Sequence, residues 1–244
     1  MPADIVLVKM RRLAGPSVRT AQPALTALAV VLLAAILVTL LVDHNSSKPA
    51  PGEGSGIAAT QVREVSPFTG IDLAGANNVI VQVGARESVV VHADSNLLAR
   101  VTTQVRSGKL VIGNTPGNLN AKAPMYVAVS VPSLDALALQ GDGNITATGI
   151  NSRSLTVIIP GSGDIHLTGA TTRLSVRISG DGTALLGQLT ARDASAVVSG
   201  DGTITLTATH SVSANVSGSG TISYGGNPSH VATSVTGSGT ITPG

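Results

Sequence analysis

Residues 141–165 read GDGNITATGINSRSLTVIIPGSGDI, and they open a repeat in which the triplet Gly-Asp/Ser-Gly occurs six times. Successive triplets are spaced by 20, 19, 20, 18 and 19 residues, and each is followed by a short polar residue and then usually by Ile. We expect the triplet glycines to form sharp turns with positive φ angles. These glycines are Gly141, Gly143, Gly161, Gly163, Gly180, Gly182, Gly200, Gly202, Gly218, Gly220, Gly237 and Gly239.

Between two triplets, each unit holds two segments, such as 144–148 and 154–158, in which apolar residues alternate with polar ones. This period of two predicts strands with one buried face. One two-stranded unit cannot bury that face alone, whereas units stacked about 4.8 Å apart join their apolar side chains into one column. The repeat therefore predicts an all-β fold, a β-solenoid and specifically a right-handed parallel β-helix. The alternative is an antiparallel sandwich or barrel.

The region before the repeat is also rich in predicted strands, but it is less regular. We expect residues 61–140 to form an irregular first part of the same domain, which packs on and caps the regular coils of residues 141–244. A short helical turn is possible at 94–99. The strands expected in this first part lie at 79–83, 89–92, 109–112 and 125–131.

Residues 24–42 read ALTALAVVLLAAILVTLLV, which contains no charged residue and is long enough for a transmembrane helix. Four basic residues precede this segment, so the positive-inside rule places residues 1–23 in the cytoplasm and the large domain outside the membrane. We therefore expect a single-pass signal anchor in a bacterial cell membrane, with a cleaved signal peptide as the alternative. Residues 43–60 are rich in Gly, Pro and Ser, which predicts a flexible linker.

Composition excludes several classes of protein. The chain has no Cys, which excludes disulfide frameworks, thiol catalysis and Cys-ligated metals. Its net charge of +2 comes from the residues before the membrane segment, because the rest carries 11 basic and 12 acidic residues. A domain without a basic stripe is not expected to bind nucleic acid.

Several motifs around the repeat are similar to a known family. The motifs are 67–71 (PFTGI), 107–112 (SGKLVI), 132–137 (PSLDAL), the six triplets, and the ending 222–228 (ISYGGNP) with 236–241 (TGSGTI). Together they resemble the auto-transporter adhesin head GIN domain family, over about residues 62–242. The resemblance implies a β-helical, envelope-exposed domain, and it supplies no catalytic residue or cofactor.

Catalytic patterns are lacking in the sequence. None of the five histidines stands at metal-ligand spacing from another ligand, and neither a G-x-S-x-G elbow nor a P-loop is present. A carbohydrate-active enzyme on a β-helix scaffold would need paired carboxylates and usually aromatic platforms, and only three aromatic residues occur, namely Phe68, Tyr126 and Tyr224. We therefore expect that the protein is not an enzyme.

Two features are candidate ligand sites. Stacking would bring Asp181 and Asp201 together, one rung apart, where a Ca²⁺ ion could bridge them. We favour the other interpretation, in which Asp and Ser in the triplets make local turn hydrogen bonds, and we therefore expect no bound metal and no cofactor. Tyr224 lies near a Gly-Gly turn, where it could stack on a sugar or cover the end of the core.

These observations predict a membrane-anchored, extracytoplasmic module for binding, envelope structure or adhesion, with an envelope glycan or protein as its partner. The alternatives are the carbohydrate-active enzyme and an envelope sensor or assembly partner of another membrane protein. Because the ends of a solenoid expose strand edges, we also expect its C-terminal end to contact a partner or a second copy of the chain.

Overall fold

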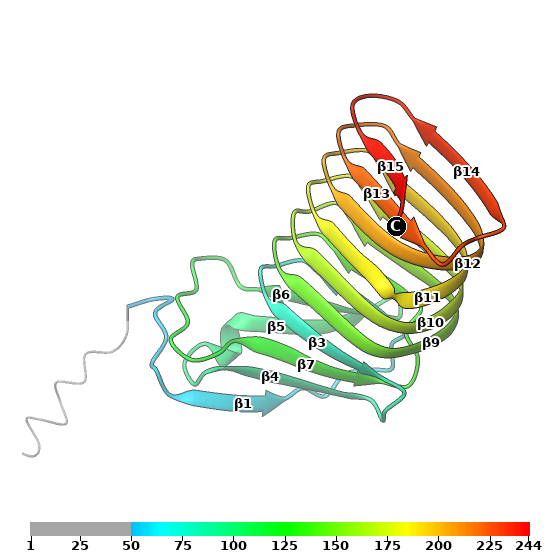
Figure 1. The fold of residues 1–244 in the computed structure, drawn as a ribbon. Coiled ribbons are helices and arrows are strands. Elements are labelled where there is room, and N and C mark those ends of the chain that lie inside the picture. Colours follow the sequence, from blue (N-terminus) through cyan, green and yellow to red (C-terminus); the bar gives the residue numbers. More distant parts are fainter. Residues whose placement is uncertain (1–49) are drawn as a thin grey trace, which may run out of the picture. The chain divides into compact units, whose positions relative to one another are not determined.

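The computed structural model describes residues 50–244, and this part of the chain folds as an all-β domain (Figure 1). The predicted cytoplasmic segment at 1–23, the predicted membrane segment at 24–42 and the start of the predicted linker lie outside the described residues. Within residues 50–244, no helix combines the length and the apolar character that crossing a membrane requires.

The regular repeat forms a β-solenoid of about five turns, as predicted. Its four long strands pair in parallel with one another, each with the strand of the next coil. Equivalent residues of successive units are in register, so that Ile145 pairs with Ile165, and Ile165 pairs with Ala184. The four strands are β9 (Asn144–Ile159), β10 (Asp164–Ile178), β11 (Thr183–Val198) and β12 (Thr203–Val216).

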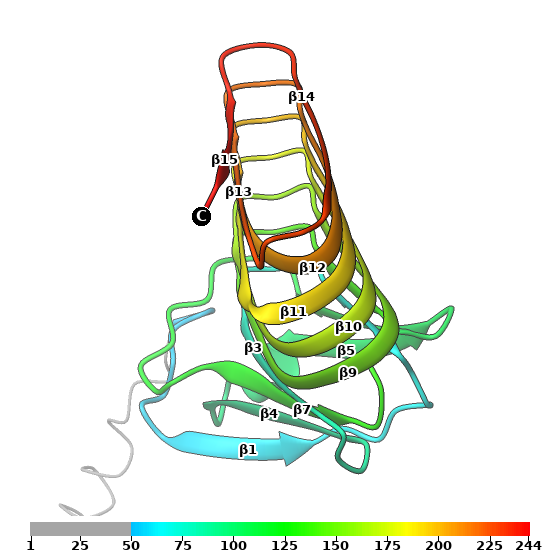
Figure 2. The same ribbon diagram turned by 45° about the vertical axis from the view of Figure 1, so that its right-hand side comes forward.

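Each coil contains one long, curved strand, whereas the sequence pattern predicted two short ones (Figure 2). The two predicted segments of the first unit, 144–148 and 154–158, both lie within β9. Between them the chain bends at Gly149, and the next coil bends at Gly169, with φ angles of 77° and 130°. The register of the pairing shifts by one residue at this bend, from Leu167 with Ala147 to Gly169 with Ile150, and parallel pairing then continues to the end of the strand.

The triplet glycines are required for a different reason than the one predicted from the sequence. Of the twelve, only Gly237 has a positive φ angle within the left-handed region. The other triplet glycines lie against the backbone of the previous coil, where a side chain has no room. A Cβ atom on Gly163 would lie 2.0 Å from the carbonyl oxygen of Gly143, and a Cβ atom on Gly202 would lie 2.7 Å from that of Gly182. Coil stacking, rather than turn conformation, therefore selects glycine at these positions.

The first part of the domain contributes two further rungs to the solenoid. In one rung β2 (Gly70–Leu73) continues into β3 (Asn78–Val83), and in the other β6 (Lys109–Asn114) leads to β7 (Tyr126–Val131). Strand β2 lies between β6 and β8 (Ala136–Leu139), and β3 lies between β7 and β9. The spatial order of these rungs therefore differs from their order in the sequence.

Antiparallel strands cover the outer edges of these first rungs. Strand β5 (Val101–Arg106) pairs with β6, and β4 (Ser88–Asp94) pairs with β7. Strand β1 (Ala58–Val62) then pairs with β4 and forms the edge of the sheet. We call this first part of the domain the base. Because its outer strands run antiparallel to the rungs, the parallel coil pattern ends here. The expected helical turn is observed as the 3₁₀ helix η1 (Leu98–Arg100).

The end of the predicted flexible linker is folded against the domain instead. The backbone N–H of Gly54 donates to the carbonyl oxygen of Asn120 at 2.9 Å, and the Asn96 side chain donates to the carbonyl oxygen of Glu53 at 2.7 Å. Residues 58–60 already belong to β1. The Gly-rich composition predicted a flexible tether. Composition alone does not show that the backbone groups of this segment form hydrogen bonds with a loop that is distant in the sequence.

Apolar side chains fill the inside of the solenoid from the base to the last coils. One column runs through Val79, Ile145, Ile165, Ala184, Ile204 and Ile222, each 0–1% exposed, and burial of one such Ile contributes about 1.5–3 kcal/mol. The last described coil exposes part of this interior, since Val231 and Val235 are each 46% exposed. That coil contains β13 (Thr221–Gly225) and β14 (His230–Val235), and β15 (Thr240–Pro243) pairs with β13 as the beginning of the next rung.

Candidate functional site

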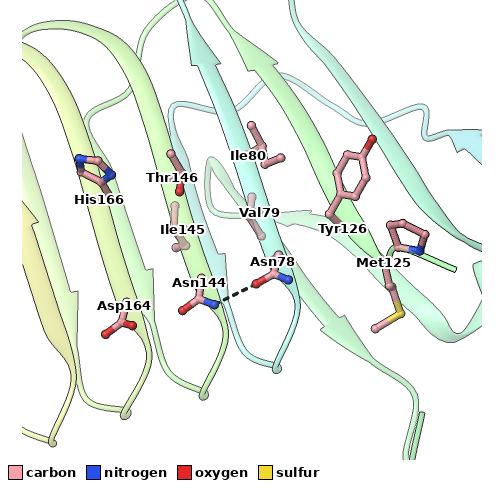
Figure 3. Close-up of a pocket in the computed structure, with 11 residues that line it drawn as sticks. Asn78, Val79, Ile80, Met125, Tyr126, Asn144, Ile145, Thr146, Asp164 and His166 are labelled. Carbon is pink, nitrogen blue, oxygen red and sulfur yellow. Dashed lines mark hydrogen bonds between the residues drawn. The ribbon is translucent and has the colours of Figure 1, made fainter. Parts of the chain in front are cut away.

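A groove on the outer face of the sheet, where the base meets the first regular coils, is the best candidate for a binding site (Figure 3). It has a volume of about 600 Å³ and crosses β7, β3, β9 and β10. We call this depression the outer groove. Its lining residues are Asn78, Val79, Ile80, Pro124, Met125, Tyr126, Asn144, Ile145, Thr146, Asp164 and His166.

Strand alternation explains which side chains reach the groove. On β7, Val127 and Val129 are buried in the core, so Tyr126 and Ala128 face outward. On the neighbouring β3 the outward residues are Asn78 and Ile80, and Ile80 is 51% exposed. Ile80 and Ala128 thus add apolar side chains to the outward face of the base, whereas the neighbouring regular coils carry Thr146 and His166 at the position of Ile80.

The ring of Tyr126 supplies the aromatic face of the groove. It stacks on the imidazole of His92 with ring centroids 4.2 Å apart and an interplanar angle of 10°. His92 belongs to β4 and Asn78 to β3, and both are paired with Tyr126 across the sheet. The ring face opposite His92 is therefore directed toward β3 and the groove. A second depression of about 370 Å³ lies on the His92 side, and it shares Pro124 and Tyr126 with the outer groove.

The lip of the groove is held by a buried carboxylate, Asp94. Its oxygens accept hydrogen bonds from the backbone N–H groups of Gly56 at 2.6 Å, Lys122 at 2.9 Å and Ala123 at 3.1 Å. Burial by itself raises the pKa of Asp94, but these N–H donors outweigh burial and lower the pKa. Pro124 follows directly, so Asp94 fixes the loop that carries one wall of the groove.

A second polar cluster lies on the opposite half of the long strands. His210 Nδ1 is 2.7 Å from Asp193 Oδ1, and the Ser211 hydroxyl donates to the same oxygen at 2.7 Å. Hydrogen bonds from Ser211 and then His210 lower the pKa of Asp193, against the opposing effect of burial. The rings of His210 and His230 contact edge to face, with centroids 5.3 Å apart.

This cluster does not have the geometry of a hydrolytic triad. In a triad the serine hydroxyl is bonded to the histidine, which takes its proton. Here Ser211 and His210 both contact the carboxylate, and Ser229 donates to the backbone carbonyl oxygen of His210. The arrangement stabilises neighbouring coils and leaves no activated nucleophile in the cluster.

The residues singled out from the sequence lie apart from the outer groove. Asp181 and Asp201 are exposed in their turns, and within residues 50–244 no group of three or more His, Asp or Glu side chains could hold a metal ion. The expectation that Asp181 and Asp201 make turn hydrogen bonds, with calcium binding as the alternative, stays a prediction. Tyr224 is only partly buried and packs against the core, in the inward row that also contains Leu206.

Sequence reasoning missed the outer groove and the Asp193 cluster. One available signal was Tyr126, which stands at an outward position of a clearly alternating strand. Another was the repeat spacing, which puts Asp193 and Ser211 at equivalent positions of successive coils. The contact of Tyr126 with His92 could not be predicted from the sequence, because it depends on the pairing of β4 with β7.

The comparisons with known proteins agree with this architecture. Residues 67–228 match the family described as "Putative auto-transporter adhesin, head GIN domain", and the chain belongs to this family. None of the curated proteins is similar enough to count as a match.

Two solved structures illustrate the similarity to known proteins. A putative adhesin from Bacteroides fragilis superposes with a TM-score of 0.66 at 23% identity, covering 78% of this chain and 99% of that chain. A putative lipid binding protein from Parabacteroides distasonis gives a TM-score of 0.47 at 22% identity, covering 79% and 98%. At these identities the first likeness supports the fold.

Proposed function

We propose that this chain is an adhesin-like, extracytoplasmic binding module that is not an enzyme and that holds its ligand in the outer groove. The family description supports the adhesin-like role. The stacked pair of Tyr126 and His92 carries the choice of site, because it presents an ordered aromatic face beside polar side chains. Asp164 is the one carboxylate among the lining residues, whereas glycoside hydrolysis uses two.

The proposal includes tethering of the module to a bacterial cell membrane by residues 24–42, with residues 1–23 in the cytoplasm. Its support is the uncharged apolar segment and the basic residues before it. Because the chain has no Cys, a single introduced Cys is a clean reporter of topology. We expect Ser162→Cys to react with a membrane-impermeant maleimide on intact cells, and Ser17→Cys to react only after lysis. Labelling of both in intact cells, or release of the module into the medium, would contradict the anchor.

Binding through the outer groove is tested with the full-length chain and isolated envelope fractions, namely cell wall, surface polysaccharide and membrane. We expect saturable binding to one fraction, and a loss of about tenfold or more in affinity for Tyr126→Ala, which removes the aromatic face. Thr205→Ala, on the same sheet face but outside the groove, should bind as the unsubstituted chain does. Equal binding by Tyr126→Ala would reject the groove.

The same experiment separates the other functions. Capture of one membrane protein alone would favour a sensor or assembly role, and release of soluble sugar fragments would indicate an enzyme. A parallel arm with a chelator tests calcium at Asp181 and Asp201. Loss of binding with the chelator, reproduced by Asp181→Asn, would support that site.

A further inference from the structure

We infer that the ligand class of the outer groove is an uncharged glycan, recognised by stacking on Tyr126 and by hydrogen bonds to an amide-rich row of side chains. This inference rests on the proposed function, since it names the chemistry of the ligand held at that same site. Four properties of the groove carry it: its charge, its aromatic face, its pattern of hydrogen-bonding groups and its length.

The charge of the groove disfavours anionic ligands. Its eleven lining residues include neither Lys nor Arg, and the one carboxylate among them is that of Asp164. Phosphate and carboxylate groups are normally bound by Arg or Lys forks or by helix N-termini. An acidic polysaccharide or a lipid phosphate in this groove would face Asp164 without a Lys or Arg side chain from the lining.

The aromatic face has the orientation that stacking requires. His92 covers one side of the Tyr126 ring in a nearly parallel contact, which fixes the plane of the ring and leaves the other side toward β3. Ile80 extends the apolar surface beside this ring (Figure 3). A pyranose ring presents an apolar face of C–H groups that matches such a surface, whereas a flexible acyl chain would gain no advantage from a fixed ring plane.

Hydrogen-bonding groups line up across the strands next to this apolar surface. Asn78, Asn144 and Asp164 occupy paired positions of β3, β9 and β10, and the Asn144 amide donates to the Asn78 side-chain oxygen at 3.0 Å (Figure 3). Within residues 50–244, no protein group donates a hydrogen bond to Asn144 Oδ1 or to the Asp164 carboxylate. A hydroxyl group both donates and accepts hydrogen bonds. The amides of this row can donate to it, and the amide oxygens and the carboxylate can accept from it.

The dimensions also fit a short oligosaccharide. The groove crosses four neighbouring strands, so it extends over about 14 Å at about 4.8 Å between strands. It is open along this direction, because the outward faces of the next strands continue the same sheet. A polymer chain could therefore lie across the strands with several sugar units in contact.

The test uses the natural scarcity of aromatic residues. The chain has no Trp and only two Tyr residues, so in full-length Tyr224→Phe the fluorescence of the single remaining tyrosine reports on the groove. We expect a saturable change on titration with neutral oligosaccharides from the cell wall or surface polysaccharide, and none with polyphosphate, anionic lipid vesicles or polyuronic acid. In the same assay Asn144→Ala should weaken binding about tenfold. Ile158→Ala, an exposed apolar residue of the other half of the coil, should not change it.

Asp164→Asn distinguishes the ligand classes. For a neutral glycan this variant should bind equally or a few times more weakly, whereas for an anionic ligand it should bind more tightly because a repulsive charge is removed. Tighter binding of anions, with a loss for Tyr126→Ala in a pull-down, would overturn the glycan inference and leave the proposed groove intact. Binding of glycans that does not change in Tyr126→Ala would overturn both.

Discussion

Gly163→Ala is expected to lower the free energy of unfolding by about 3 kcal/mol and the melting temperature by about 6–12 °C. The added Cβ atom would lie 2.0 Å from the carbonyl oxygen of Gly143 and 2.9 Å from a methyl carbon of Leu139. The first of these atoms belongs to the backbone of the previous coil, so the clash can be relieved only by separating two coils that pair along a whole strand. Thermal unfolding followed by circular dichroism measures the effect.

Gly187→Ala is the matched control for this substitution. Gly187 lies in β11, its φ angle is not positive, and an added Cβ would lie 3.6 Å from the nearest atom, the Thr205 methyl group. The same chemical change should therefore alter stability by less than about 1 kcal/mol. If Gly163→Ala melts at the temperature of Gly187→Ala, close stacking of the coils is not the reason for glycine at the triplets.

Asp94→Asn is expected to detach the segment 50–57 and loosen the loop that precedes Tyr126. The buried carboxylate accepts three backbone hydrogen bonds, and an amide offers one acceptor oxygen and directs its own N–H groups at those donors. We expect hydrogen exchange at Gly56, Lys122 and Ala123 to accelerate by about tenfold or more, together with weaker ligand binding at the groove. Asp142→Asn, an exposed carboxylate in a turn, is the control. Unchanged exchange in Asp94→Asn would contradict the role of this carboxylate.

Acid should have the same effect on the unsubstituted chain. The pKa of Asp94 is lower in the folded domain than the usual value of an aspartate side chain, so the folded state binds this proton less readily than the unfolded state. The stabilisation is fully present above about pH 4 and is lost as the pH falls through the lowered pKa. The protection of the Gly56 amide, which is its exchange rate relative to the intrinsic rate at the same pH, should therefore fall between pH 4 and pH 2 in the natural chain, whereas in Asp94→Asn this acid-dependent component should be absent.

The regular coils could be predicted from the sequence because the repeat itself encodes their register. Once Ile145 and Ile165 occupy equivalent positions, parallel stacking follows from the need to bury both. The reason for the glycines could not be read in the same way. A glycine is consistent both with a positive φ angle and with a close backbone contact, and only the distance between coils separates the two.

The base could be predicted only in part. Alternation predicts β3, β4, β6 and β7, but β1, β2, β5 and β8 were missed. Because β6 and β7 carry no triplet, nothing in the sequence indicates that they lie outside β2 and β3. The groove depends on the same non-local pairing. Tyr126 meets His92 through β4 and meets Asn78 through β3, and each of these contacts joins segments that are far apart in the chain.

The interleaved order of the first rungs has a consequence for the time course of synthesis. Strand β2 is made early, yet both of its neighbours, β6 and β8, are made later, and β8 ends only at Leu139. At about 5–20 residues per second, β2 therefore waits several seconds for its partners after it leaves the ribosome. Each regular coil, in contrast, can pair with the previous, already folded coil as soon as it leaves the ribosome. A pause in translation within residues 74–139 is thus the event most able to divert this chain into aggregates, and a pause among the later coils should be harmless.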